Sequence, residues 1–411
     1  MELTKLSNGE FYNFVNSSFL ASYYQTYEYA RFIQELNLDY ELLGIKDSYN
    51  NIIAASLIVI VHIDKKYIFG YAPRGFIIDY RDNNLVKDFA NAISKYFKKK
   101  NMVFLKINPN IIISEYDKKD NKFIFNNNTR FIENLRKNKF QMLKKNKYFE
   151  SLLPAYCPLV DLKTFNFASM PKNARNKISK CYRKGLSIDK VGLEKLDDIY
   201  PFIKNKTKKS YDYYRSLYMS FDKGDMIDLF AVKVDFEEFL INTKEKYQQT
   251  LEMQNILSKI IRYDKSDKIL KRKLQCDKEL LTLKNDIILA TQGLSKNKTL
   301  IIAGAMVIKF KDKVFIYTSA YNKKYKGLNA NYFMYYKLIE YYKYNYNFLG
   351  IEGITGDLSL SNPYKGLNDF KMCFNPRIYE YIGEFDIIYN NRIYNKISSN
   401  GTLSKIFKNI K

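Results

Sequence analysis

The sequence of 411 residues is poor in the residue types that build metal sites and disulfide frameworks. It has a single histidine, His62, which excludes any mechanism or metal site that needs two. Its 4 cysteines are scattered without a CxxC pair, which argues against a disulfide scaffold or zinc knuckle and is typical of a reducing compartment. With 16 glycines and 8 prolines, a collagenous or linker-dominated chain is also excluded.

Long apolar segments are missing as well. The longest apolar run, residues 52–62, is far shorter than the ~18 residues that a membrane-spanning helix needs. Residues 1–14 lack the basic-then-apolar layout of a signal peptide. We therefore expect a soluble, cytoplasmic protein, and its length predicts two or three domains of roughly 100–200 residues each.

What the sequence has in excess is positive charge. Its 68 lysines and arginines outnumber 43 acidic residues, which gives a formal net charge of +25. Such a charge is typical of a protein that binds a polyanion, either a nucleic acid or the anionic face of a membrane. Codon bias explains the charge equally well, because Lys, Asn, Ile and Tyr are abundant and Trp is absent. The placement of the charges must therefore decide between the two.

The first 150 residues have the pattern of a mixed α/β domain. A helical period runs through residues 18–36, and a turn at residues 62–66 predicts a hairpin between two apolar strands. The expected elements after the first helix are strands over residues 40–46, 52–63 and 66–71, a loop over 71–82, a helix over 84–98 and a strand over 102–107.

A second α/β pattern starts near Cys157 and is interrupted by a segment of different character. Residues 235–289 contain no Pro or Gly, are dense in charge, and place Leu274, Leu281 and Ile288 at heptad spacing. This predicts a protruding hairpin of two antiparallel helices, each of about 25 residues and some 40 Å. Around the hairpin we expect strands over residues 159–162, 228–234, 300–310, 314–319 and 378–385, and helices over 173–184, over 329–346 and from about 366.

These patterns predict an α/β (α+β) protein with two similar halves, the second interrupted by the helical hairpin. The expected division is one domain over residues 1–150, a second over 151–234 and 298–395, the arm over 235–297, and a C-terminal tail over 396–411.

One expected helix gathers positive charge. Residues 173–184 end at Gly185, a good C-cap, and the helix bears five basic side chains: Arg175, Lys177, Lys180, Arg183 and Lys184. Such a helix suits the phosphate backbone of a nucleic acid, and an ordinary solvated basic face is the alternative interpretation.

Two further segments could contact a ligand. The loop over residues 323–330 places a glycine and lysines before a helix, which weakly resembles the loop that binds the acyl-CoA pyrophosphate in acetyltransferases. Tyr364 and Lys371 follow a Gly-punctuated stretch, and a lysine between Phe370 and Phe374 could act as a desolvated cation that stabilises an oxyanion or a phosphate. On local sequence alone, a surface lysine is the preferred interpretation of Lys371.

Taken in order, these segments resemble the Fem/Mur peptidyltransferases, the tRNA-dependent aminoacyltransferases that build the interpeptide branches of peptidoglycan. The resemblance covers nearly the whole chain. Its motifs are QTYEYARF at 25–32, PRG at 73–75 with Asp79, LKINP at 105–109, the basic helix ending at Gly185, Lys209 with Arg215, GITGD at 353–357, DFKMCF at 369–374 and YEYIGEFD at 379–386.

The resemblance implies two GNAT (acyl-CoA N-acyltransferase)-like domains, with an antiparallel coiled-coil arm inserted in the second. It implies transfer of an amino acid from aminoacyl-tRNA to the side-chain amine of residue 3 of the stem peptide, on lipid II or on UDP-MurNAc-pentapeptide. An aminoacyl ester is already activated, so the reaction needs neither a metal nor a cofactor, only alignment and oxyanion stabilisation. Peripheral contact with the inner membrane face is also implied, through basic and aromatic surface.

Carried over by position, the resemblance places Lys371 at the reaction centre and assigns substrate binding to several other residues. Arg215 matches an arginine that pairs with the precursor phosphate, with Tyr218 as the nearest counterpart of the tyrosine after it. Tyr317 matches a tyrosine of the precursor channel, and Tyr364 is a further expected contact.

Two positions depart from the family pattern. A family lysine near the first helix falls at Ile33, so a phosphate contact there would have to come from Arg31. The aspartate at a strand end is Asn108, which can hydrogen-bond but cannot take a proton. The amine would therefore lose its proton to another group.

Two alternatives from other functional classes stay open. The loop over residues 323–330 permits a GNAT-like enzyme that transfers an acyl group from acyl-CoA to a small amine. A catalytically silent scaffold that binds RNA or membrane would keep the fold and the basic face. The retained Lys371 and Arg215 argue against a scaffold, whereas Asn108 and Ile33 argue for it.

Overall fold

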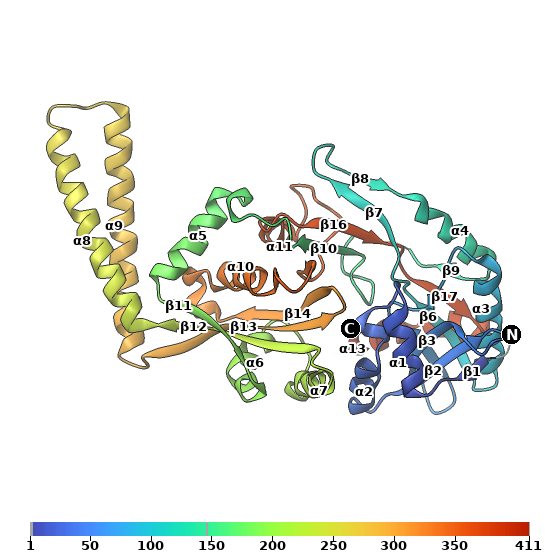
Figure 1. Cartoon of the computed structure of the whole chain (residues 1–411). Helices are drawn as coiled ribbons and strands as arrows, with labels where there is room; N and C mark the ends of the chain where they lie inside the picture. Colours follow the sequence, from blue (N-terminus) through green and yellow to red (C-terminus); the bar gives the residue numbers. More distant parts are fainter. Residues whose placement is uncertain (1–2, 145–146, 411) are drawn as a thin grey trace.

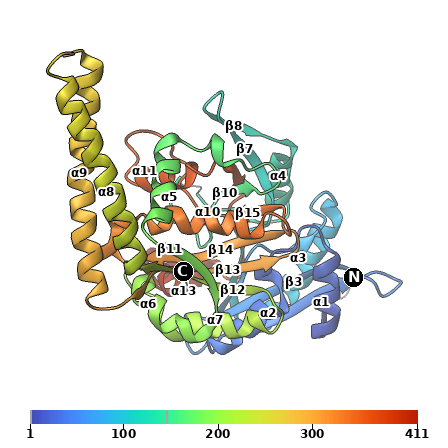
Figure 2. The ribbon, with the colours of Figure 1, turned by 60° about the vertical axis from the view of Figure 1, so that its left-hand side comes forward.

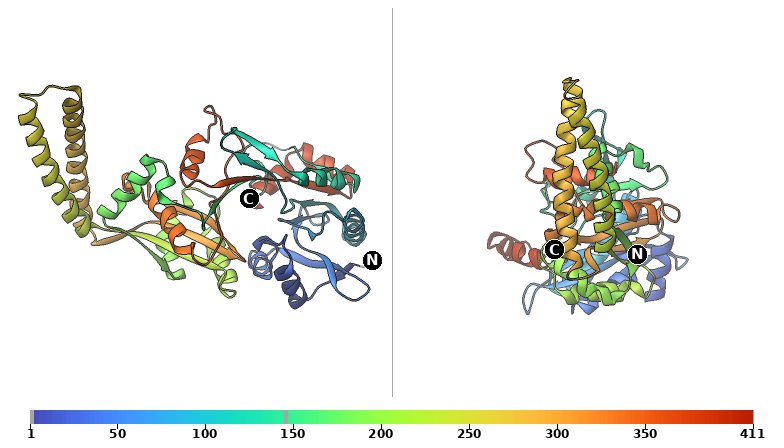
Figure 3. Two further views of the ribbon diagram at one scale, coloured as in Figure 1. Left: turned by 45° about the horizontal axis from the view of Figure 1, so that its top comes forward. Right: turned by 90° about the vertical axis from the view of Figure 1, so that its left-hand side faces the viewer.

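The structure, a computed structural model, describes residues 3–144 and 147–410. It is a mixed α/β molecule built on two sheets, with a two-helix arm that stands apart from the rest (Figure 1). The predicted fold class is confirmed at this level. Helices pack on both sheets, and the arm leaves the second sheet at one end of the molecule (Figure 3).

The first sheet has eight described strands in the order β1-β2-β3-β4-β6-β17-β9, with β5 paired to β3. Neighbouring strands are antiparallel except β4 and β6, which run parallel. Its strands are β1 (Leu3–Lys5), β2 (Asp39–Lys46), β3 (Ile52–His62), β4 (Ile68–Ala72), β5 (Ile77–Ile78), β6 (Met102–Ile107), β9 (Gln141–Met142) and β17 (Phe385–Ile388). The predicted hairpin of β3 and β4 is confirmed.

The second sheet has nine described strands in the order β11-β12-β13-β14-β15-β10-β16-β7-β8. Here too one neighbouring pair is parallel, β14 with β15. Its strands are β7 (Ile112–Asp117), β8 (Lys122–Phe125), β10 (Tyr156–Asp161), β11 (Leu186–Val191), β12 (Ile227–Asp235), β13 (Thr299–Phe310), β14 (Lys313–Tyr321), β15 (Phe348–Gly350) and β16 (Arg377–Tyr381).

The helices fill the connections between these strands. They are α1 (Asn8–Ser17), α2 (Tyr27–Glu35), α3 (Asn83–Lys98), α4 (Arg130–Lys137), α5 (Lys172–Arg183), α6 (Leu196–Lys204), α7 (Tyr211–Asp222), α8 (Phe236–Ile260), α9 (Asp267–Leu294), α10 (Ala330–Tyr342), α11 (Lys365–Met372), α12 (Asn391–Ser399) and α13 (Thr402–Ile410). The last two occupy much of the segment predicted as a tail.

The sheets do not follow the predicted division at residue 150. The β7–β8 hairpin belongs to the first 150 residues but pairs with the second sheet, and β17 returns from the C-terminal part to the first. The expected single strand over residues 378–385 is therefore wrong. It is split into β16 and β17, because the backbone turns at Gly383, whose φ is 99°, and crosses from one sheet to the other.

The predicted first helix is also shorter than expected. Residues 18–36 do not form one helix, because the Thr26 side chain accepts the Tyr29 N–H at 3.2 Å and starts α2 there. Before it, the buried Gln25 side chain bonds to Leu57 and to the Pro73 carbonyl. These bonds hold residues 18–25 as a turn and a short 3-10 helix.

The arm consists of the antiparallel helices α8 and α9, joined near the predicted break (Figure 2). The heptad-spaced Leu274, Leu281 and Ile288 do not lie in the contact between the helices, since they are 55%, 63% and 48% exposed. Among the buried positions, two series are also spaced by seven residues, and most of their side chains are small: Thr243, Thr250 and Leu257 on α8, and Cys276, Leu283 and Ala290 on α9. Small side chains let the two helices approach; the coiled-coil character itself stays a prediction.

Candidate functional site

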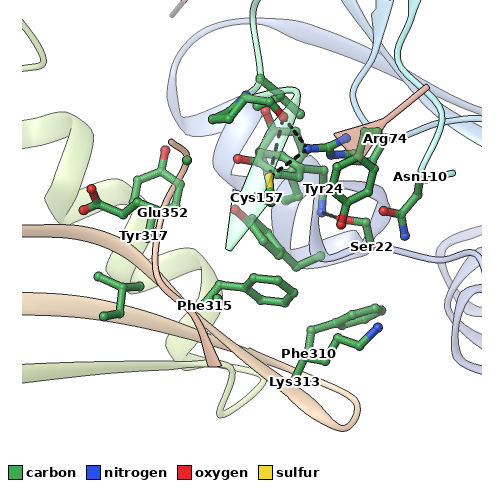
Figure 4. A pocket seen from close by; sticks show the side chains of 18 of the residues that line it. Ser22, Tyr24, Arg74, Asn110, Cys157, Phe310, Lys313, Phe315, Tyr317 and Glu352 are labelled. Carbon is green, nitrogen blue, oxygen red and sulfur yellow. Dashed lines mark hydrogen bonds between the residues drawn. The ribbon is translucent and has the colours of Figure 1, made fainter. Parts of the chain in front are cut away.

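A cavity of about 920 Å³ lies between the two halves. Residues that follow strands of both parallel pairs line it. The chain after β4 contributes Arg74, the chain after β6 contributes Asn110, and the chain after β15 contributes Glu352 and Gly353. Figure 4 shows Arg74 and Glu352 on opposite sides of this space. Loops after the carboxyl ends of parallel strands are common places for ligand sites.

The halves meet around the cavity through one shared apolar core. Side chains of α1 and α2, such as Phe11 and Phe32, belong to the same buried cluster as Leu217 and Phe221 of α7. Because this core is continuous, the two sides of the cavity are held in a defined relation to each other.

At one end of the cavity lies a buried guanidinium. Arg74 is 7% exposed and has a φ of 53°, an uncommon value for a residue other than glycine. Its backbone N–H donates to Asn108 Oδ1 at 2.7 Å. Its Nη2 donates to the Pro154 carbonyl at 3.0 Å, and the guanidinium carbon lies 3.7 Å from the centre of the Tyr381 ring.

At the other end a carboxylate lies between two lysines. Glu352 also has a positive φ, 62°, and lies just after β15. It accepts hydrogen bonds from Lys206 Nζ at 3.1 Å and Lys371 Nζ at 3.3 Å, and Ser319 Oγ donates to it at 3.2 Å. Burial acts to raise the pKa of Glu352, but the two lysines outweigh it and the pKa is lowered, so the carboxylate is ionised near neutral pH.

Lys371 lies behind this wall of the cavity. It is 2% exposed, and its Nζ also donates to the Gly353 carbonyl at 2.8 Å. Burial lowers the pKa of Lys371, and the neighbouring Glu352 partly opposes that effect. A lysine held this way is a cation that little water screens.

Aromatic side chains form much of the rest of the lining. The hydroxyls of Tyr213 and Tyr317 are 2.5 Å apart, and burial raises the pKa of both phenols, so they stay protonated. Figure 4 shows Phe310 and Phe315 on the side of the second sheet. The cavity thus combines an apolar, phenol-rich interior with opposite charges at its two ends.

The predicted substrate-binding residues do not all reach this cavity. Tyr317 lines it. Arg215 is exposed on α7, outside the described lining, whereas Tyr213 and Tyr214 of the same helix are part of it. Tyr218 is buried and also lies outside the described lining.

The remaining three predicted contacts lie near the cavity or beyond it. Asn108 is buried behind the wall, where it holds the Arg74 backbone. Tyr364 is half-exposed and packs against the cavity residue Phe149 with ring centres 5.4 Å apart. Arg31 lies against the Tyr27 ring on α2, outside the described lining.

The predicted basic helix forms as α5 and ends at Gly185, whose φ is 63°. One of its residues is wrongly assigned to a tRNA surface. Lys184 is buried, and its Nζ forms an ion pair of 2.9 Å with Asp286 of the arm. Lys177 contacts the Tyr332 hydroxyl at 3.1 Å, Arg175 Nε bonds to the Met170 carbonyl, and Arg183 is half-buried. Of the five, Lys180 is the one that is exposed.

Sequence reasoning missed three residues that line the cavity: Arg74 and Glu352 at its ends, and Lys206 beside Glu352. Arg74 and Glu352 share a signal that could have marked them. Each is a charged residue in a glycine-containing loop directly after a short buried strand. Lys206 gave no such signal, because it is one of several lysines in residues 204–209.

Comparison with known proteins agrees with this architecture. The sequence model of the FemAB family matches residues 6–399. Among curated proteins, an aminoacyltransferase FemB of Staphylococcus epidermidis is 25% identical over 93% of this chain and 94% of its own. An aminoacyltransferase FemA of Staphylococcus aureus is 24% identical over 93% of this chain and 94% of its own. A crystal structure of FemX superposes with a TM-score of 0.72 at 17% identity, covering 97% of this chain and 100% of the other.

The chain therefore belongs to the FemAB family, and the resemblance found in its motifs is confirmed. The similarity to FemX shows that the fold is shared. Across the described part of the chain, none of the helices has both the length and the apolar character that crossing a bilayer requires.

Proposed function

We propose that this protein transfers an amino acid from aminoacyl-tRNA to the side-chain amine of residue 3 of the peptidoglycan stem peptide, and so builds the interpeptide bridge. Membership of the FemAB family and the names of the curated relatives, which are aminoacyltransferases, support an enzyme of this class. A GNAT-like division of the two halves and a coiled-coil arm belong to the same proposal.

The observation that carries the proposal is the Lys371–Glu352 pair at the wall of the cavity between the two halves. The reaction has to bring two large substrates to one point, and a cavity lined from both halves suits that task. It also has to stabilise the negative charge that develops on the ester oxygen. Lys371, a buried cation beside the lining residues Glu352 and Gly353, is suited to that role.

In the proposed step the neutral acceptor amine attacks the ester carbonyl carbon. A C–N bond forms, and the carbonyl oxygen becomes an oxyanion that Lys371 stabilises. The intermediate then collapses, the C–O bond to the terminal ribose of the tRNA breaks, and the amide product forms. The amine loses one proton and the leaving ribose oxygen takes up one. The reaction therefore balances without a cofactor.

We assign the acceptor of the amine's proton to Glu352. The described lining residues include two carboxylates, Glu352 and Asp312, and Asp312 is exposed at the turn between β13 and β14. Glu352 is ionised and close to Lys371, as a general base at the same reaction centre must be. This assignment explains how the reaction proceeds with Asn108 where a strand-end aspartate was expected.

The net charge of +25 gives both anionic substrates a partner surface. The exposed Lys180, with Arg175 and Arg183 on the same helix, supports a contact with tRNA. The acceptor is lipid II or UDP-MurNAc-pentapeptide. We place the reaction in the cytoplasm, with peripheral contact at the inner membrane face when the acceptor is lipid-linked.

The test is transfer of radiolabelled amino acids from bulk charged tRNA, with lipid II and UDP-MurNAc-pentapeptide offered in parallel. We expect labelled product on one of the two acceptors. The radiolabelled amino acid that it carries is the one that the enzyme transfers. No transfer to either acceptor, together with a rise in melting temperature caused by coenzyme A, would replace the proposal with a GNAT-like acyltransferase. No transfer with tRNA binding retained would indicate a silent scaffold.

A further inference from the structure

Arg74 is a buried cation for which the described chain provides no counter-charge. Its Nη2 donates to the Pro154 carbonyl and contacts Cys157 Sγ at 3.8 Å. Its Nε and Nη1 have no hydrogen-bond partner among the described residues, and no described carboxylate forms an ion pair with it. Burial raises the pKa of the Cys157 thiol, so this cysteine is neutral and supplies no negative charge.

An uncompensated buried charge is costly in a folded protein. The Tyr381 ring offsets part of that cost, since the guanidinium stacks on its face at 3.7 Å. The neutral carbonyl of Pro154 offsets another part. Neither group neutralises the charge, and Arg74 lines the cavity, where a ligand can reach it.

A second side chain at the same place also lacks a partner. Tyr71 lies near the end of β4, three residues before Arg74, and is 4% exposed. Tyr71 belongs to the cavity lining, and its buried hydroxyl has no hydrogen-bond partner among the described residues. A buried hydroxyl without a partner costs free energy that a bound polar group would recover. A guanidinium and a phenol together offer donors that match an oxyanion.

The position of Arg74 is built rather than incidental. The residue adopts a positive φ of 53°, which non-glycine residues adopt at some cost, mostly where function or surrounding structure holds them. The bond from its N–H to Asn108 Oδ1, at 2.7 Å, fixes this backbone conformation from the neighbouring strand β6. Asn108 is thus a positioning residue for Arg74, which accounts for a buried amide at the end of that strand.

We propose that Arg74 and Tyr71 form an oxyanion subsite at the inner end of the cavity, which binds a carboxylate or phosphate group of the acceptor. The inference deepens the proposed function and rests on it only for the identity of the acceptor. A carboxylate and a phosphate both present negatively charged oxygens, which are what the subsite would bind. The terminal carboxylate of the stem peptide is one source of such a group, and the pyrophosphate of the precursor is the other.

Equilibrium binding tests the subsite without any transfer reaction. Three ligands are titrated by calorimetry: UDP-MurNAc-pentapeptide, the same molecule with a C-terminal carboxamide, and the free pentapeptide. Each is measured with the unchanged protein, with Arg74→Gln, and with Arg81→Gln as a matched control. Arg81 is an exposed arginine paired with Asp79 at 2.8 Å, outside the described cavity lining.

We expect Arg74→Gln to weaken binding about ten- to a hundredfold, the range for a hydrogen bond to a charged group, and Arg81→Gln to change it less than twofold. A loss with both carboxylate ligands but not with the carboxamide identifies the peptide terminus. A loss with both UDP-linked ligands but not with the free peptide identifies the pyrophosphate. No loss with any ligand, or an equal loss with all three, overturns the proposal.

Two further variants keep the test valid if Arg74→Gln is unstable. Arg74→Lys retains the positive charge but loses the planar guanidinium. Its affinity for the ligands should lie between those of the unchanged protein and Arg74→Gln. Tyr71→Phe removes the unpartnered hydroxyl and should weaken binding about three- to tenfold without lowering the melting temperature. If transfer fails but binding depends on Arg74, the proposed function is wrong and the subsite stands. If transfer occurs and binding is independent of Arg74, the subsite alone is wrong.

Discussion

The two sheets each contain one described parallel strand pair, β4 with β6 and β14 with β15, and residues that follow β4, β6 and β15 line the same cavity. The first places a guanidinium there, Arg74, for which the described residues supply no counter-charge. The second places a carboxylate, Glu352, between two lysines. The chain after one strand of each pair thus supplies opposite charges to the same cavity. Both sheets therefore position a residue at the cavity in a similar way. The charge of that residue decides which ligand group each sheet can bind.

The first test of this comparison removes Lys371, the buried cation beside Glu352 of the second sheet. We expect Lys371→Met to lower kcat about a thousandfold, because the oxyanion loses its principal stabilising charge. Lys365→Met is the matched control, since Lys365 lies on the same helix, α11, and is paired with Asp369 at the surface. Single-turnover transfer from charged tRNA measures both variants. A thousandfold loss in the control as well would assign the effect to the helix and not to Lys371.

Removing the carboxylate tests the same side by its pH dependence. We expect Glu352→Gln to lower kcat about a hundredfold, as the loss of a general base does. In the unchanged enzyme, protonation of Glu352 sets the acidic limb of the kcat–pH profile. Because the pKa of Glu352 is lowered, this limb lies at a lower pH than an ordinary glutamate would give. Because Glu352 opposes the lowering of the Lys371 pKa, its removal should lower that pKa further and shift the alkaline limb to lower pH.

The pH profile of kcat between about pH 3 and 10 checks this prediction. Asp312→Asn, which removes the exposed carboxylate of the cavity lining, should leave both limbs in place. An unchanged alkaline limb in Glu352→Gln would show that Lys371 does not set it.

A buried charge away from the cavity should matter for stability and not for chemistry. We expect Lys184→Met to lower the free energy of unfolding by about 3 kcal/mol, because Asp286 is left buried and unpaired. Denaturant unfolding measures this loss, and the folded fraction should keep its kcat. A variant with both Lys184→Met and Asp286→Leu should recover most of the stability. Loss of activity at full stability would place Lys184 in the functional surface after all.

The smallest effects are expected on the arm. Leu281→Ala should change the free energy of unfolding by less than about 0.5 kcal/mol, because this side chain is exposed. Leu283→Ala, two residues away in the buried seam, should cost about 2 kcal/mol. Thermal and denaturant unfolding of the pair compare the two directly. A larger cost at Leu281 would mean that the exposed stripe is covered in solution.

Local signals in the sequence predicted much of the fold. Gly185 ends α5 in a left-handed conformation, and the turn at residues 62–66 joins β3 to β4. The arm was found because a long charged segment without Pro or Gly, residues 235–289, can be recognised as helical along the sequence. Its contact seam was not found, because two heptad-spaced series are present and only packing decides which one is buried.

The candidate site was predictable only in part. The resemblance of the motifs pointed to Lys371 and Tyr317, and both lie at or behind the cavity wall. Arg215, Tyr218 and Arg31 lie outside the described lining, and Lys184 is buried against the arm. A basic residue on a predicted helix does not reveal whether it faces water, a carboxylate or a ligand, since that depends on which element packs against it.

By itself the sequence determined the class of protein: an α/β chain of the FemAB family with a helical arm and an excess of positive charge. Helix caps, turns and motif order act over a few residues, so they can be read along the chain. Only the tertiary structure decided which charges meet. Arg74 and Glu352 lie 278 positions apart in the numbering and share one cavity because two sheets exchange strands and bury a common core. Burial, and the strength that it gives to a charge, exists only after that packing is complete.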